Sequence, residues 1–347
     1  MPGGAVQVVH FGLGPVGQGI ARLVLETGAF KIVGATDPSP HVAGRDLGDV
    51  LELGRRLRLK VEEDPARFLK KASAHVAFVS TRSSARDVVP LVLGIVKKGM
   101  NVVTTCEELA YPTPSSAAKF KEIDKAAKLK KVSVLATGVN PGFAMDALAL
   151  ALTAPCASVN RVSVTRVVDA ATRRLPLQRK IGVGLNLAQF RHAITDGLVR
   201  HVGLVESAYM IAAGLGWKLE RVDETVDAAV APRDLETPFL RVPAGSAAGI
   251  RQSVRAYRNG QLAITLDLQM YVGAEAPRDH ILIDGTPPVD ATIAGGLAGD
   301  LATAAVAVNS VPHLLAAPAG MLTMLDIPLV HSFNEGELKS AFGTRKR

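Results

Sequence analysis

The chain has 347 residues, of which 48% are hydrophobic and 21% are charged. This length is typical of two domains, and the many apolar side chains exclude intrinsic disorder as the main state. The 32 glycines and 20 prolines follow no period, which excludes collagen-like and low-complexity architectures. The formal net charge of +8 is scattered along the chain, and with one tryptophan and four tyrosines the sequence lacks an aromatic platform for single-stranded nucleic acid. We therefore expect no nucleic-acid partner.

Cysteine usage and the apolar pattern bear on the compartment. Two cysteines, Cys106 and Cys156, are too few for a disulfide framework and fit a reducing environment. The first residues show no basic segment followed by an apolar stretch, so no secretory signal is predicted. The longest apolar region, residues 301–331, is interrupted by prolines and polar residues and is too broken to span a bilayer. We expect a cytoplasmic protein with no membrane partner.

The first segment has the order of a nucleotide-binding unit. A β-rich run, Val6–Phe11, leads into the glycine motif Gly12-Leu13-Gly14-Pro15-Val16-Gly17. Residues 18–27 then suit a helix, residues 31–36 suit a second strand, and Asp37 follows directly. Strand, glycine turn, helix, strand and acidic residue is the order that a βαβ dinucleotide site requires.

Each glycine of this motif has a physical role. Gly12 allows the tight turn, Gly14 lets the backbone approach a pyrophosphate, and Gly17 lets the helix pack close to the strand. The N-terminus of the helix that follows offers N–H groups and the positive end of its dipole to phosphates, and Pro15 and Val16 lie between the last two glycines. We expect all five residues to contact the cofactor. The alternative is a glycine turn in an α/β fold that binds no ligand.

The acidic residue bears on the choice of cofactor. Asp37 lies 20 residues after Gly17, where a carboxylate can hold a ribose 2′-hydroxyl. Its charge repels a 2′-phosphate, so the predicted cofactor is NAD or NADP, with NAD favoured. Ser39 and Arg45 can still accommodate a phosphate, which leaves NADP open.

Helical and strand patterns continue to alternate up to residue 137. The helical patterns and strands fall at 63–72, 75–80, 85–98, 101–105, 115–130 and 132–137. Such alternation with short links predicts an α/β fold with a doubly wound parallel Rossmann sheet. Ligands of such sheets bind beyond the carboxyl ends of the strands. The cofactor is therefore also expected to contact residues that follow these strands, namely Ser80, Thr81, Arg82, Thr105, Cys106 and Asn140.

The pattern changes in the second part of the chain. Residues 158–170, 218–230 and 247–273 alternate Val, Thr, Arg and Leu, and Asn259-Gly260 is a hairpin signal. With a predicted helix over 195–215, this region indicates an α+β domain with a mostly antiparallel open sheet. The open face of that sheet can pair with a second copy, so we expect a homodimer.

These patterns divide the chain into three segments. Residues 1–140 are the predicted NAD(P)-binding Rossmann domain, and residues 141–298 are the predicted substrate and dimerisation domain. Residues 299–347 are a C-terminal helix and tail that return to the Rossmann domain, with one long apolar helix predicted over 300–317.

Two adjacent acids follow the strand at 101–105. Glu107 and Glu108 would lie at the cofactor crevice, where a carboxylate favours a cation and can accept a proton from an amine. At 4 Å and an effective dielectric near 20, opposite unit charges attract by about 4 kcal/mol. An iminium ion about to receive hydride is such a cation, so the pair points to C–N chemistry with Glu108 or Glu107 as the catalytic residue. The alternative is that both acids merely begin a helix.

Two other potentially reactive side chains are not predicted to act as a nucleophile or as a metal ligand. Cys106 lacks an ordered His or Asn partner and is expected to pack beside the nicotinamide rather than act as a nucleophile. His201 has no second ligand three or four residues away, so we expect no metal site.

The chain resembles the native amine dehydrogenases and the related 2,4-diaminopentanoate dehydrogenases. The segments that carry the resemblance are spread over nearly the whole chain and keep their order. They are His10–Gly19 (HFGLGPVGQG), Thr105–Pro112 (TCEELAYP), Thr137–Asp146 (TGVNPGFAMD), Arg173–Leu185 (RRLPLQRKIGVGL), His201–Ser207 (HVGLVES) and Gly299–Pro312 (GDLATAAVAVNSVP).

The resemblance implies a two-domain homodimer that catalyses NAD(P)-dependent, reversible reductive amination of ketones or aldehydes with ammonia. It implies a glutamate of the TCEE motif, Glu108 or its neighbour Glu107, as acid/base. The residues it places in the substrate pocket are Phe143, Met145, Arg166, His201 and Thr303. Ala144 and Met145 stand where members with small pockets carry bulky aromatic residues, which suggests a roomier pocket.

Three alternatives remain open. A dihydrodipicolinate reductase-like enzyme shares the domain plan but is expected to carry a paired-His motif, and no His-His pair occurs here. A homoserine dehydrogenase-like enzyme would have a Lys where Glu108 stands. A non-catalytic module that senses the nicotinamide ratio would keep the glycines and Asp37 but need neither acid.

Overall fold

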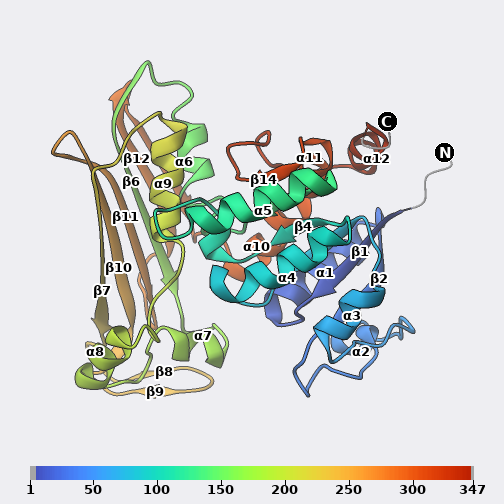
Figure 1. The fold of residues 1–347 in the computed structure, drawn as a ribbon. Helices are drawn as coiled ribbons and strands as arrows, with labels where there is room; N and C mark the ends of the chain where they lie inside the picture. Colours follow the sequence, from blue (N-terminus) through green and yellow to red (C-terminus); the bar gives the residue numbers. More distant parts are fainter. Residues whose placement is uncertain (1–4, 345–347) are drawn as a thin grey trace. The chain divides into compact units, whose positions relative to one another are not determined.

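A computed structural model describes residues 5–344, and the chain divides into two compact units (Figure 1). The first unit combines the residues up to 143 with those from 298 onward, and the second consists of residues 144–297. The chain therefore leaves the first unit once and returns to it.

The first unit is built on a parallel six-stranded sheet with the order β14-β5-β4-β3-β1-β2. Every pair of neighbouring strands in it is parallel. The strands are β1 (Val6–Phe11), β2 (Phe30–Thr36), β3 (Val76–Val79), β4 (Asn101–Thr104), β5 (Ser133–Ala136) and β14 (Gly320–Leu322). The doubly wound parallel sheet is thus confirmed, with β14 as an edge strand that the sequence patterns did not predict.

Helices cover both faces of this sheet, so its short central strands are apolar and buried on both sides. On one face Val9 and Phe11 of β1 join a core with Phe68, Val92 and Ile123 from three of the helices. The helical elements are α1 (Pro15–Glu26), α2 (Leu47–Val50), α3 (Pro65–Lys71), α4 (Ala85–Lys97), the 3₁₀ turn η1 (Glu107–Leu109), α5 (Ala117–Lys130), α10 (Gly299–Asn309), α11 (Val311–Ala316) and α12 (Glu335–Thr344).

The second unit is built on a six-stranded sheet with the order β13-β12-β6-β11-β10-β7. Only the β11–β6 pair in it is parallel, which confirms the predicted mostly antiparallel sheet. Its elements are α6 (Ala147–Leu152), β6 (Ser158–Asp169), α7 (Leu175–Lys180), α8 (Leu187–Thr195), α9 (Leu204–Gly214), β7 (Arg221–Val230), β8 (Leu235–Glu236), β9 (Arg241–Val242), β10 (Ala247–Arg258), β11 (Gln261–Tyr271), β12 (Arg278–Thr286) and β13 (Val289–Ala294).

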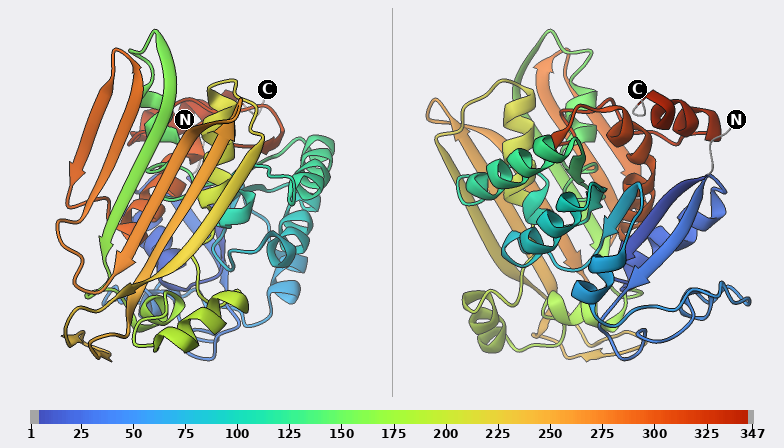
Figure 2. Two further views of the ribbon diagram at one scale, coloured as in Figure 1. Left: turned by 90° about the vertical axis from the view of Figure 1, so that its left-hand side faces the viewer. Right: turned by 45° about the vertical axis from the view of Figure 1, so that its right-hand side comes forward.

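One face of this sheet is packed and the other is open. Helix α9 lies against β10 and β11, and Figure 2 (left) shows the face that α9 does not cover. The tight turn between β10 and β11 has positive φ at both Asn259 (51°) and Gly260 (71°), as the Asn-Gly signal predicts.

Two helix predictions are wrong in their extent. The helix predicted over 195–215 is only α9, because Gly197 and Gly203 take positive φ values of 70° and 117° that a helix cannot continue through. The helix predicted over 300–317 is two helices, α10 and α11, since Pro312 near the start of the second has no N–H to offer a longer one. Apolar continuity alone did not reveal either break.

Within residues 5–344, no helix is both long enough and apolar enough to cross a membrane.

Candidate functional site

The glycine turn lies where the strand order of the parallel sheet reverses. Strand β1 pairs with β2 on one side and with β3 on the other, and this switch point is where open α/β sheets bind ligands. Gly12 follows β1 with φ +91°, and a Cβ at this residue would lie 2.3 Å from the carbonyl oxygen of Ser80, which follows β3. Only glycine allows the two strand ends to approach this closely.

The other two glycines differ in what surrounds them. A Cβ on Gly17 would lie 2.1 Å from the carbonyl oxygen of Gly12, so this glycine lets α1 pack against the turn. A Cβ on Gly14, in contrast, would have no heavy atom of the described chain within 4 Å apart from those of Gly14 and its immediate chain neighbours. Among the described residues, no side chain caps helix α1, which starts at Pro15, and its first turn contains no acidic residue. An open approach to an uncapped helix N-terminus suits a phosphate group.

Asp37 lies at the end of β2 and binds the glycine turn. Its Oδ2 accepts a hydrogen bond from the Leu13 N–H at 2.6 Å, and its Oδ1 accepts one from the Ser39 N–H at 2.8 Å. Leu13 is the residue between the first two glycines of the motif. The carboxylate therefore already lies beside the turn, where a ribose held by this site would lie.

Two polar side chains in the loops that follow strands of the parallel sheet have buried polar atoms with no hydrogen-bond partner within residues 5–344. They are the hydroxyl of Ser80, after β3, and the side-chain amide of Asn140, after β5. Buried polar groups are normally paired, so groups of this kind are suited to a ligand. Together with the open approach to Gly14, they fit a dinucleotide at this edge.

The return of the chain from the second unit brings Thr303 of α10 to the same edge. Its Oγ1 accepts a hydrogen bond from the Val139 N–H at 3.2 Å, and a Cβ on Gly138 would lie 3.3 Å from its methyl group. The structure thus places this predicted pocket residue directly beside the segment that holds Asn140. Sequence distance alone could not have related them.

The two acids follow β4 in η1 and are half-buried. Glu108 accepts a hydrogen bond on Oε2 from the Ala85 N–H at 2.8 Å, at the first residue of α4. Its own N–H donates to the carbonyl of Ser83 at 3.3 Å. A helix N-terminus attracts negative charge, so this contact gives Glu108 a local structural partner at the carboxyl edge of the sheet.

Cys106 precedes the acids and is buried. Its thiol donates to the carbonyl of Ser83 at 3.1 Å. Burial, and then the nearby charges of Glu107 and Glu108, raise the pKa of the Cys106 thiol far above its usual range. A protonated, buried thiol is a poor nucleophile, in line with the packing role expected for it.

The remaining predicted residues of the first unit vary in exposure. Thr81 and Arg82 follow β3 and are exposed, whereas Thr105 is half-buried and donates its N–H to the carbonyl of Val79 at 3.0 Å. Phe143 ends the first segment of this unit and is half-buried.

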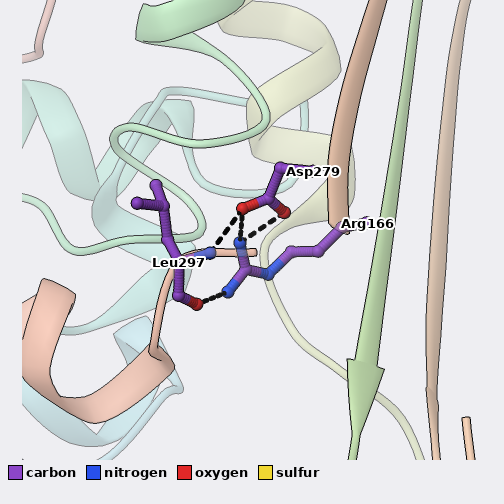
Figure 3. Close-up of polar contacts among 3 residues, drawn as sticks. All are labelled: Arg166, Asp279 and Leu297. Carbon is purple, nitrogen blue, oxygen red and sulfur yellow. Dashed lines mark hydrogen bonds and ion pairs between the residues drawn. The ribbon is translucent and has the colours of Figure 1, made fainter. Parts of the chain in front are cut away.

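Arg166 of the second unit has a buried partner. It stands directly opposite Asp279 in the β6–β12 register, and its Nη1 lies 2.6 Å and 2.7 Å from the two carboxylate oxygens (Figure 3). Its Nη2 donates to the carbonyl of Leu297 at 2.5 Å, and the Leu297 N–H donates to Asp279 at 2.8 Å. The guanidinium predicted for the substrate pocket therefore anchors the end of this unit, and Asp279 is a partner that the sequence patterns did not reveal.

His201 lies in the same unit and is held by its backbone. Its N–H donates to Gln252 Oε1 at 2.8 Å, and its carbonyl accepts from Gln252 Nε2 at 2.7 Å. The ring Nδ1 is buried with no partner among the described residues. Burial, reinforced by the positive charges of Lys180, Arg166 and Arg200, lowers the pKa of the His201 imidazole to about 3. His201 is therefore a neutral ring with an unused nitrogen.

A further buried contact joins two of the segments that carry the family resemblance. Asp146 is the N-cap residue of α6 and accepts a hydrogen bond from the Ser207 hydroxyl of α9 at 2.7 Å. Met145, predicted for the pocket, is fully buried just before it. Part of the shared pattern thus contributes to the packing of the second unit.

Comparisons with known proteins agree with this geometry. The family model of the 2,4-diaminopentanoate dehydrogenase C-terminal domain matches residues 143–341. A 2,4-diaminopentanoate dehydrogenase of Acetoanaerobium sticklandii is 31% identical over 334 residues, covering 93% of this chain and 94% of that protein. An amine dehydrogenase of Streptomyces virginiae is 22% identical and covers 93% of this chain and 96% of its own length.

Among solved structures, an amine dehydrogenase from Mycobacterium smegmatis superposes with a TM-score of 0.86 at 22% identity, covering 95% of this chain and 98% of that one. The glycine turn, the partnerless polar groups beside it and these relatives define an NAD(P)-dependent oxidoreductase. The chain belongs to the 2,4-diaminopentanoate dehydrogenase family, within the amine dehydrogenases.

Proposed function

We propose that this protein is an amine dehydrogenase that interconverts a primary amine with a ketone or aldehyde and ammonia. The observation that carries the proposal is the half-buried acid pair, Glu107 and Glu108, placed directly after β4 at the carboxyl edge of the parallel sheet. The names of the two curated relatives and of the solved structure support amines as the substrate class.

The first unit would bind the cofactor through the glycine turn, Asp37, Ser80 and Asn140. When bound, the nicotinamide exchanges a hydride with the substrate carbon. In the reductive direction, ammonia adds to the carbonyl carbon and water leaves, and an acidic side chain supplies and accepts the protons of these two steps. The resulting iminium is a cation, and a carboxylate at about 4 Å stabilises it by about 4 kcal/mol at an effective dielectric of 20.

Glutamine variants test the role of the acids. Glu108→Gln removes the charge but keeps an oxygen that can accept the Ala85 N–H, so the cap of α4 is preserved. If Glu108 is the acid/base, its kcat should fall by about 100- to 10,000-fold while the NADH affinity stays near that of the wild type. Glu107→Gln is the matched control, since it makes the same change one residue away. If that variant loses the activity instead, the catalytic role belongs to Glu107.

The hydrogen bond from Ala85 favours a second candidate, in which Glu108 only caps α4 and the protein is a nicotinamide-binding module without chemistry. The decisive assay follows NADH at a fixed wavelength with a panel of ketones, with and without ammonia, and NAD with the matching amines. No ammonia-dependent oxidation of NADH on any ketone would support the module.

We also propose that NAD is preferred over NADP, because Asp37 lies beside the glycine turn. Asp37→Asn keeps an acceptor for the Leu13 N–H but removes the charge that repels a 2′-phosphate. The ratio of NADP to NAD affinity, measured by fluorescence titration, should rise by about tenfold, which corresponds to about 1.4 kcal/mol. An unchanged ratio would contradict the ribose role.

The homodimer is a further part of the proposal. The alternation of buried and exposed residues along β10 and β11 puts arginine–tyrosine pairs on the face that α9 leaves open, with Arg251 beside Tyr271 and Arg221 beside Tyr257. Arginine and tyrosine are enriched in protein interfaces. Light scattering should give twice the chain mass of 36.4 kDa.

A further inference from the structure

Three metal-ligating side chains gather in the C-terminal part of the first unit, apart from the residues proposed for catalysis. His313 lies in α11, His331 lies in the segment before α12, and Glu337 lies in the first turn of α12. One ligating atom of each residue lies within 4.8 Å of the others. The two helices pack against each other, and Figure 1 shows both near the C-terminal end of the chain.

The hydrogen bonds around this cluster prepare its atoms for a cation. His331 Nδ1 lies 2.9 Å from the carbonyl of Ser332, so it must donate, and its Nε2 carries the free lone pair. That Nε2 lies 3.8 Å from Glu337 Oε1. Asn334 accepts the Glu337 N–H at 3.0 Å and thereby fixes the first turn of α12.

His313 adds an independent observation. Its Nε2 is buried and has no hydrogen-bond partner within residues 5–344, and its ring centre lies 5.5 Å from that of His331. An imidazole nitrogen without a hydrogen-bond partner can donate its lone pair to a metal ion.

We propose that His313, His331 and Glu337 form a binding site for a divalent transition metal, with Zn²⁺ as its cation. Two imidazoles and one carboxylate are a donor set that zinc accepts, with water as the fourth ligand. Tetrahedral ligands about 2.1 Å from zinc lie roughly 3.4 Å from one another, so the atoms must close by up to about 1.4 Å. The exposed His331 and half-buried Glu337 can do so by side-chain rotation.

The position of the site indicates a structural role. Around it, Phe333 packs edge-on against Phe30 at the start of β2, and Phe342 of α12 packs against His75, just before β3. These contacts lie at the amino ends of the strands, the opposite edge from the glycine turn. The metal would therefore tie α12 to α11 and leave the proposed chemistry untouched. The sequence predicts no metal site because these ligands are 18 and 6 residues apart, a spacing that matches no common motif.

The test uses the full chain without a polyhistidine tag, stripped with a chelator and then given ZnCl₂. Metal analysis after gel filtration should find about one zinc per chain. Competition with a chromophoric zinc indicator should show at least about 100-fold weaker binding for His313→Ala, His331→Ala and Glu337→Gln. His192→Ala is the matched control, because His192 forms an exposed pair with Asp196 at 3.4 Å in the second unit, outside the proposed site.

Two further measurements cover variants that fail to fold. On the wild-type chain, Co²⁺ should give the visible absorption of a tetrahedral site, and zinc should raise the melting temperature by about 3 °C or more. NADH affinity should not change with zinc. The site would be overturned if the wild-type chain bound less than one zinc or gave an octahedral cobalt spectrum. It would also be overturned if all three ligand variants bound zinc as tightly as the wild type. If the amine dehydrogenase assay failed, the metal-site proposal would be unaffected, because no step of the proposed reaction depends on these three residues.

Discussion

Buried polar groups at the carboxyl edge of the parallel sheet differ from those on the covered face of the mixed sheet in whether they have hydrogen-bond partners. At the edge, the Ser80 hydroxyl and the Asn140 amide have no partner within the described chain. On the covered face, Arg166 is fully engaged by Asp279 and Leu297, and Gln252 is engaged by His201. A buried polar group without a hydrogen-bond partner lowers the stability of the fold unless a ligand supplies the partner. A buried polar group that is paired within the chain stabilises the fold.

The same comparison separates two residues that the family resemblance puts in one pocket. Arg166 has the partners of a structural residue, while the Nδ1 of His201 is buried with none among residues 5–344. His201 is thus the better candidate for contact with substrate, and Arg166 the better candidate for supporting the unit.

The largest effect is expected for the buried ion pair. Asp279→Ala should lower the free energy of unfolding by about 3–5 kcal/mol, because it leaves the Arg166 charge buried and unpaired. The double variant Arg166→Met with Asp279→Leu should regain most of this loss. Urea unfolding followed by circular dichroism measures both. For comparison, His201→Asn should raise the substrate KM and leave the unfolding midpoint nearly unchanged. If His201→Asn instead lowered the midpoint and the Arg166 variant raised the KM, the pocket role would belong to Arg166.

An intermediate effect should separate two glycines of one motif. Gly17→Ala puts a Cβ 2.1 Å from the Gly12 carbonyl oxygen and should destabilise the first unit by about 3 kcal/mol. Gly14→Ala meets no atom of the described chain, so its thermal unfolding should match the wild type. Its NADH dissociation constant should nevertheless rise by about tenfold or more, because the methyl group occupies the approach of the phosphates. Unchanged NADH binding in Gly14→Ala would remove the pyrophosphate from this turn.

The smallest effect concerns a buried histidine within strand β1. His10 of β1 stacks on Phe78 with ring centres 5.2 Å apart, and burial lowers the pKa of its imidazole to about 3. Between pH 6.5 and 3 the unfolded chain binds the proton and the folded chain does not, so stability falls as the pH falls. From pH 6.5 to 5 this amounts to about 2 kcal/mol for one histidine.

Replacing His10 should make the stability of the protein fall less steeply as the pH is lowered. The urea midpoint of His10→Leu should depend less on pH between 6.5 and 5 than that of the wild type, whereas the exposed control His192→Gln should keep the wild-type slope. His201, whose pKa is also about 3, supplies a similar dependence in the second unit. Identical slopes in His10→Leu and wild type would mean that His10 is protonated in the folded chain.

Local patterns predicted most of the elements that build the parallel sheet. Val6–Phe11 was found with the same bounds, and the other four predicted strands are right to within a residue at either end. These strands are short, buried on both faces and bounded by turns, so their signal is local. The helices predicted over 195–215 and 300–317 failed because positive-φ glycines and a proline divide apolar runs that look continuous.

The sequence by itself determined the order of the elements, the glycine turn and the acids that follow β4, because hydrophobic period and turn chemistry act over a few residues. Only the tertiary structure decided which side chains share a neighbourhood. Thr303 reaches Val139 across 164 residues, Arg166 meets Asp279 across 113, and His313 meets His331 and Glu337 through the packing of α11 and α12. Such partners depend on strand register and helix packing, which bring distant parts of the chain together and leave no periodic trace in the sequence.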